Sequence, residues 1–150
     1  MRGKGAEPED KRKHLEFIQG VINRMASNSF LFKGWSVTII AAVSAFATKD
    51  DAPELMIIPI VSTLIFWFID GYYLMLERAF RTLYNEVSST HYSKIDYKMN
   101  IKKISFRSWI QVTFKRPVLW FFYGATLVLL SLLTFVINDY GLEVTITNGS

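Results

Sequence analysis

The chain contains no cysteine and only two histidines among its 150 residues. The lack of cysteine excludes disulfide bonds, thiolate metal sites and a cysteine nucleophile. The histidines, His14 and His91, are far apart, and neither has a second ligand at the spacing that metal sites use. The sequence also has no glycine-rich phosphate loop, HExxH motif or GxSxG motif. We therefore expect no enzymatic activity, no catalytic residues, no bound metal and no cofactor.

Charge is scarce in three long hydrophobic runs, which are residues 30–48, 55–70 and 118–137. About 20 apolar residues cross the ~30 Å hydrocarbon core of a bilayer, so each run is a candidate membrane span. The first run contains Lys33 near one end, the second ends at Asp70, and the third has no charge. The sequence predicts an all-α membrane protein with three transmembrane helices.

The segment before the first span, residues 1–29, divides into a tail and an amphipathic helix. Residues 1–10 hold glycine, proline and charges and are expected to be disordered. Beyond them apolar residues recur at helical spacing, at Leu15, Ile18, Ile22 and Met25. Such a helix lies on the membrane surface or packs on a partner helix, and the pattern favours neither. The N-terminus lacks the short apolar core of a cleavable signal peptide.

After the second span ends at Asp70, the segment of residues 71–117 begins without an obvious helix stop. A helical face follows at Leu76, Ala79, Phe80, Leu83, Tyr84 and Val87. Alternation over residues 95–102 indicates a short strand, with a helix as the alternative, and residues 105–115 resemble an interfacial helix. Pro117 suits the first turn of the third span. In the tail, residues 138–150, the pattern indicates a strand at 143–147.

Lysine and arginine are distributed unevenly between the two sides of the predicted spans. Six precede the first span and nine lie between the second and third, while the loop at residues 49–54 has one and the tail has none. Cationic loops stay in the cytoplasm. The count of fifteen against one predicts a cytoplasmic N-terminus and an extracytoplasmic C-terminus.

Two features of the spans are candidates for a functional role. Small residues recur on one side of the first span, at Gly34, Thr38, Ala41, Ala42, Ala45 and Thr48. They let helix backbones approach closely, so this side is expected to contact helices, either within one protomer or around a pore in an oligomer. A carboxylate in a span is a functional candidate by default, which makes Asp70 a candidate gate. The alternative is an interfacial carboxylate in water, or paired with Arg78 or another cation.

The segment after the second span is rich in cations and aromatic rings. Its candidate ligand-binding residues are Lys94, Tyr97, Lys98, Lys102, Lys103, Arg107 and Trp109. Cations that bind phosphate and rings that stack on bases are the parts of a site for a nucleotide or single-stranded nucleic acid. The same composition suits a cytoplasmic loop beside the anionic lipid of the bilayer.

Two stretches resemble a known group of proteins, HLEFIQGVINRMASNSFLFKGWSVTIIAAVSAFA at residues 14–47 and FWFIDGYYLMLERAFRTLYNEV at residues 66–87. They resemble small bacterial inner-membrane proteins, some of which accompany nucleotide-synthesising anti-phage systems as predicted pore-forming effectors. Among them, a Hailong-type effector controlled by single-stranded DNA would suit the basic, aromatic segment. The resemblance implies an effector held shut or opened by a nucleotide or oligonucleotide from a partner nucleotidyltransferase.

These features predict a homo-oligomeric, channel-like or pore-forming membrane effector of anti-phage defence, gated by a nucleotide or single-stranded oligonucleotide. The alternative is a non-conducting accessory or assembly protein that docks a cytoplasmic partner through its helical extension. The cytoplasmic pieces are too short to form an independent enzyme core.

Overall fold

Helices make up almost all of the chain. The computed structural model describes residues 8–49, 53–101 and 103–148. Within these residues there is no strand, and three helices are long and apolar enough to cross a membrane. The chain is therefore an all-α membrane protein, and the predicted fold class is confirmed.

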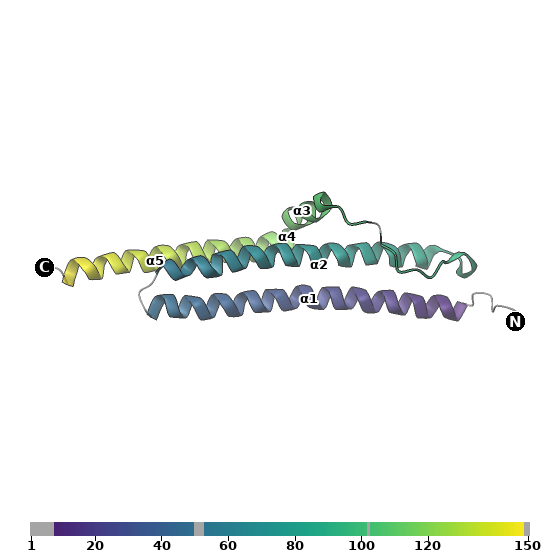
Figure 1. The fold of residues 1–150 in the computed structure, drawn as a ribbon, viewed down its shortest axis with the longest axis horizontal. Coiled ribbons are helices and arrows are strands. Elements are labelled where there is room, and N and C mark those ends of the chain that lie inside the picture. Colours follow the sequence, from purple (N-terminus) through teal and green to yellow (C-terminus); the bar gives the residue numbers. More distant parts are fainter. Residues whose placement is uncertain (1–7, 50–52, 102, 149–150) are drawn as a thin grey trace.

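Two long helices, α1 (Pro8–Lys49) and α2 (Ile57–Ser89), lie side by side and antiparallel along most of the molecule (Figure 1). At 1.5 Å per residue they are about 63 and 50 Å long, well beyond the ~30 Å of a hydrocarbon core. One half of the pair therefore has the length to cross a membrane while the other half projects beyond it.

The first helix is continuous from the predicted amphipathic segment into the predicted first span. It begins at Pro8, and Glu9 and Asp10 occupy its first turn, where proline and acidic residues favour a helix start. The expectation of disorder is wrong for residues 8–10, and residues 1–7 lie outside the described part of the chain. No break separates the projecting half of α1 from its hydrophobic half.

The projecting half is held together by an apolar core between α1 and α2. Its buried members are Ile18, Ile22 and Val87, and the partly buried side chains around them are Leu15, Phe80, Leu83, Tyr84 and Ile95. The N-terminal amphipathic segment thus packs on a partner helix, one of the two predicted alternatives. The same contacts confirm the apolar face predicted for the extension of α2.

At the other end of the helical pair, the short 3-10 helix η1 (Pro53–Met56) precedes α2. A second core joins Ala47 of α1, Met56 of η1, and Leu130 and Ile137 of the third span. The predicted polar hairpin at residues 49–54 includes residues 50–52, which lie outside the described residues.

The segment after α2 is irregular where a strand was expected. A short 3-10 helix, η2 (Tyr92–Lys94), precedes a linker whose described residues, 95–101 and 103–105, form neither helix nor strand. Tyr97 has a φ of 54°, in the left-handed region, which interrupts the extended backbone that a strand needs. No other strand is available to pair with it in the described part of the chain, so the strand prediction is wrong. The predicted interfacial helix is present as α3 (Phe106–Lys115).

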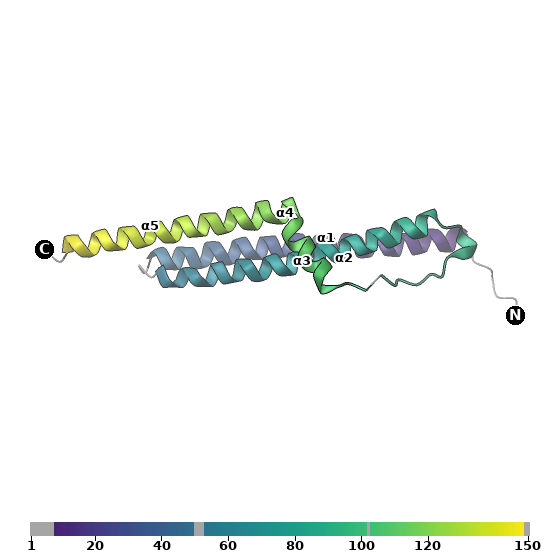
Figure 2. The same cartoon turned by 90° about the horizontal axis from the view of Figure 1, so that it is seen from above.

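The third span begins at Pro117, as predicted. It consists of α4 (Pro117–Leu119), the π-helix η3 (Trp120–Gly124) and α5 (Ala125–Asn148) in one continuous helical run. Because α5 remains helical to Asn148, the strand predicted at residues 143–147 is also wrong. In Figure 2, α5 extends past the connected ends of α1 and α2, and the two chain termini lie at opposite ends of the molecule.

Candidate functional site

A buried ion pair joins α1 to α2 where α2 leaves its hydrophobic half. The Asp70 side chain is 0% exposed, and its Oδ2 accepts a hydrogen bond from Nζ of Lys33, which is 20% exposed. Its other oxygen, Oδ1, accepts from the hydroxyl of Ser29. The carboxylate is therefore not in water, and its cationic partner comes from another helix.

The geometry of α1 brings both donors to the same place. Ser29 and Lys33 are four residues apart, so they share the side of α1 that faces α2. The Lys33 Nζ also donates to the Ser29 Oγ at 3.0 Å. The lysine ammonium and the aspartate carboxylate therefore neutralise each other, and the serine hydroxyl hydrogen-bonds to both. A buried charge needs such pairing and hydrogen bonding, because it is otherwise very costly to desolvate.

The third span supplies a third donor to the same carboxylate. The Tyr123 hydroxyl donates to Asp70 Oδ2 at 3.2 Å, and the Tyr123 side chain is fully buried. Its ring stacks on Trp67 of α2 with the centroids 6.0 Å apart and the planes 11° from parallel. Tyr123 lies in the π-helix η3, and single π-helical turns often occur at functional sites. All three spans therefore meet at Asp70.

Helix α3 is held against α2 one residue further along, at Gly71. A Cβ atom on Gly71 would lie 2.2 Å from Oγ1 of Thr113, so only glycine fits here. Two indoles fix this contact: Trp67 Nε1 donates to the Thr113 carbonyl oxygen, and Trp109 Nε1 donates to the Phe68 carbonyl oxygen, both at 3.1 Å. Together these contacts form a junction between the helices, made by Ser29, Lys33, Asp70, Gly71, Thr113 and Tyr123.

The sequence nominated Asp70 but not its partners. Lys33 is the cation, although Arg78 was the one named as an example. Ser29 and Tyr123 carried no signal that linked them to Asp70. The general alternative of a carboxylate paired with a cation is what the structure contains, in a fully buried rather than an interfacial setting.

The small-residue side of α1 does not pack within the protomer. Gly34, Thr38, Ala41, Ala42 and Ala45 are all exposed, and nothing lies within 4 Å of the position of a Cβ on Gly34. The side that packs on the other helices instead carries Ser36, Ile40 and Ala47. The alternative that the small residues pack helices within one protomer is therefore wrong.

The predicted ligand-binding residues do not form one groove. The cations Lys94, Lys98, Lys103 and Arg107 are exposed, at separate points along the linker and the start of α3, and Lys102 lies outside the described residues. Lys98 has Asp96 as an ion-pair partner at 3.7 Å.

The two nominated rings face their own chain. Tyr97 contacts His14 edge-on, with the ring centroids 5.5 Å apart, and Trp109 packs on Phe68 of α2. Partial burial raises the pKa of Tyr97, and the Asp10 carboxylate adds to the effect, so the phenol stays protonated. Base stacking on either ring would require these contacts to rearrange.

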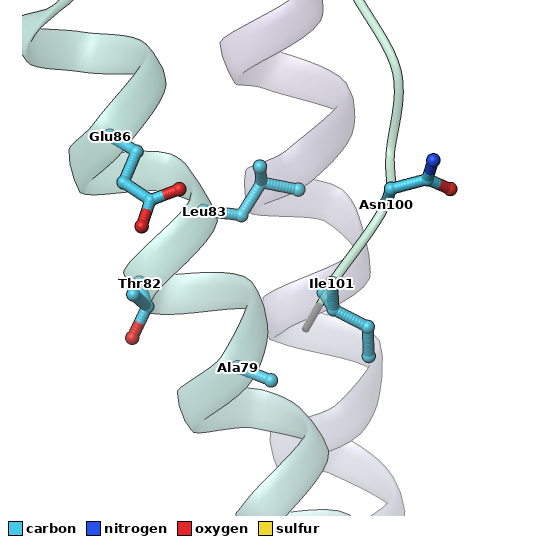
Figure 3. A pocket seen from close by; sticks show the side chains of 6 residues that line it. All are labelled: Ala79, Thr82, Leu83, Glu86, Asn100 and Ile101. Carbon is cyan, nitrogen blue, oxygen red and sulfur yellow. The ribbon is translucent and has the colours of Figure 1, made fainter. Parts of the chain in front are cut away.

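The described residues of the projecting half form several hollows. The hollow in Figure 3, between α2 and the linker, measures about 110 Å³ and is lined by Ala79, Thr82, Leu83, Glu86, Asn100 and Ile101. Small-molecule sites usually measure about 300–1,000 Å³, so it is too small for a nucleotide. A second hollow of about 340 Å³ includes Lys94, and a third of about 460 Å³ includes Phe17 and Arg24.

Among the residues that the structure describes, no group of three histidine, aspartate or glutamate side chains could hold a metal ion. Comparisons with protein-family models, curated proteins and solved structures find no match for this chain. The fold and the junction define the class: a helical membrane protein with three candidate spans, tied together by a buried lysine–aspartate pair.

Proposed function

We propose that copies of this chain assemble into a channel-like pore whose path is lined by the small-residue side of α1. The observation that carries the proposal is an uncovered small-residue side on the same helix that holds the buried ion pair. Three spans cannot enclose a water path, so a ring of copies is required. Small side chains and the Thr38 hydroxyl leave room for such a path at the centre of the ring.

In this proposal the Lys33–Asp70 pair is the latch that keeps the pore shut. It ties α1 to α2, and Tyr123 ties the third span to the same carboxylate. Ionisable residues are rare in spans and mark functional positions, because burying them is costly. A rotation of α1 that opens the path would separate Lys33 from Asp70. The free energy of this ion pair therefore sets the fraction of pores that are open.

We further propose that the pore lies in a bacterial inner membrane with the projecting half in the cytoplasm. The excess of lysine and arginine on that side supports this orientation. The resemblance noted above supports a role in anti-phage defence, with a nucleotide or single-stranded oligonucleotide as the opening signal. Open depressions of about 340 and 460 Å³ in the projecting half leave room for such a ligand to bind at the surface.

One observation favours the alternative of a non-conducting accessory protein. The Phe17 side chain is 69% exposed at the hollow of about 460 Å³, well outside the spans. An exposed aromatic side chain beside a hollow suits an anchor from a partner protein. This alternative predicts no ion flux under any condition.

Ion flux from vesicles separates the two functions. We expect the Asp70→Asn variant to leak a small cation about tenfold faster than wild type, because the latch loses its charge. Adding Ala41→Leu should return the flux to the wild-type value, since a larger side chain narrows the path. Adding Val128→Leu instead is the control, because it enlarges an exposed side chain on α5. Equal flux from all four proteins, with normal helicity, would contradict the pore and support the accessory role.

A further inference from the structure

One side of the amphipathic helix α3 packs against α2. Trp109 and Thr113, four residues apart, form a row along α3 that faces α2. Thr113 is fully buried against Gly71, and Trp109 is partly buried against Phe68. Phe114 also packs on Trp67 and Phe68 of α2, and Figure 1 shows α3 lying at the outside of the helical bundle, next to α2.

The outward surface of α3 carries two further rows at the same spacing. One is apolar, with Phe106 70% exposed and Phe114 43% exposed, the ring of Phe114 packing on Trp67 and Phe68 with its inner part. The other is cationic, with Arg107 and Lys115 on either side of Gln111, and all three are exposed. An apolar row beside a cationic row is the pattern of a helix that lies in the plane of a membrane surface.

The aromatic residues around α3 place it at the boundary of the membrane. The Trp120 indole donates to the Phe114 carbonyl oxygen at 2.7 Å, and Trp120 and Trp67 contact each other with ring centroids 5.2 Å apart. Trp120 is 51% exposed and Phe121 is 83% exposed. Tryptophan collects at the level of lipid headgroups, so α3 lies where the hydrocarbon ends.

The charge of this surface is not balanced by the protein. The sequence has no aspartate or glutamate between Asp96 and Asp139. Asp70 is paired with Lys33, Glu77 with Arg81 and Asp96 with Lys98. Within the described residues Arg107 and Lys115 have no ion-pair partner. An anion from outside the chain is therefore needed to neutralise Arg107 and Lys115 at the level of the headgroups.

We propose that the outward surface of α3 binds the headgroups of anionic phospholipids, with Arg107 and Lys115 on the phosphates and Phe106 and Phe114 among the upper acyl chains. The lipid then binds the outer side of α3, while Thr113 and Trp109 on its inner side pack on Gly71 and Phe68 of α2. A membrane lipid fits this surface better than a nucleic acid, because an apolar row and a cationic row lie next to each other on it, and the Trp109 ring that could stack on a base packs on Phe68 instead. The proposal stands whether or not the protein conducts ions.

A probe on α3 itself tests this binding, and the absence of native cysteine makes the labelling specific. The full chain with Gln111→Cys carries a fluorophore and is placed in nanodiscs that contain phosphatidylcholine with or without phosphatidylglycerol. Headgroup-labelled quencher lipids of each type report which lipid collects at α3. We expect phosphatidylglycerol to quench about fivefold more effectively per mole, the preference that one lysine or arginine near an anionic surface supplies. High salt should reduce the preference, because it screens surface charge.

Matched variants decide whether the preference belongs to this surface. Arg107→Gln with Lys115→Gln should make the two lipids quench equally. Arg12→Gln with Lys13→Gln removes two exposed cations from the projecting half and should leave the preference unchanged. Equal quenching by both lipids in the otherwise wild-type chain would overturn the proposal, as would an unchanged preference in the Arg107 and Lys115 variant. Displacement of anionic lipid from the label by added single-stranded DNA would assign the surface to nucleic acid instead.

Discussion

Replacing Lys33 by methionine is expected to destabilise the protein more than replacing Asp70 by asparagine. Breaking a buried ion pair by removing one partner costs about 3–5 kcal/mol, because the other charge stays buried. Asp70 is 0% exposed and cannot reach water, so Lys33→Met should cost an amount in that range. Lys33 is 20% exposed on a long flexible stem, so in Asp70→Asn its ammonium can turn toward the interface.

Thermal unfolding of the two variants in the same lipid nanodiscs measures this asymmetry. The double variant Lys33→Met with Asp70→Asn should be more stable than Lys33→Met alone, because no charge is left unpaired. Lys13→Met is the control, since Lys13 is 60% exposed on the same helix and its ion pair with Glu9 contributes little. An unfolding free energy of Lys33→Met equal to that of the control would show that the ion pair does not stabilise the fold.

The same substitution, glycine to alanine, is expected to have opposite effects at two positions. Alanine in place of glycine stabilises a helix interior by roughly 0.5–1 kcal/mol. Gly34→Ala should show this gain, because no atom lies within 4 Å of the new Cβ. Gly71→Ala should lose about 1–3 kcal/mol, because its Cβ would lie 2.2 Å from Thr113 Oγ1 and 3.1 Å from Thr113 Cα.

Helix α3 should also come away from α2 in the Gly71→Ala variant. Hydrogen exchange of the α3 amides measures this release directly, with Gly34→Ala as the matched control. Adding Thr113→Ala to Gly71→Ala should recover only part of the loss, since the Thr113 Cβ would still lie 2.9 Å from the new methyl group. A neutral or stabilising Gly71→Ala would mean that α3 does not rest on Gly71.

The sequence predicted the long elements because their signals are long. The hydrophobic runs and the apolar face of residues 76–87 each extend over several turns, and all of them are helical in the structure. Both predicted strands rested on alternation over a few residues. In the linker, alternation reflects an extended chain with Ile95 and Tyr97 partly buried and Asp96 and Lys98 exposed, but without a second strand to pair with. At residues 143–147 the helix simply continues.

The junction could be predicted only in part. The sequence nominated Asp70, but its pairing with Lys33, at the same end of the neighbouring antiparallel span, was not predicted. Tyr123 could not be assigned, because the π-helical turn at Trp120–Gly124 sets which side of the third span faces Asp70. The Gly71–Thr113 contact depends on where α3 crosses α2, and no local pattern encodes that position.

The central claim, that the small-residue side of α1 lines a conducting path, is tested most directly by cysteine accessibility. Single cysteines are placed at Thr38 and, as a control, at the exposed position Val128 of α5, both in the Asp70→Asn background. Current across a planar bilayer is recorded before and after a charged thiol reagent is added. The account predicts that the reagent blocks the current through the Thr38→Cys protein and leaves the Val128→Cys current unchanged. A Thr38→Cys current that the reagent does not alter, or a reconstituted protein that carries no current, would contradict it.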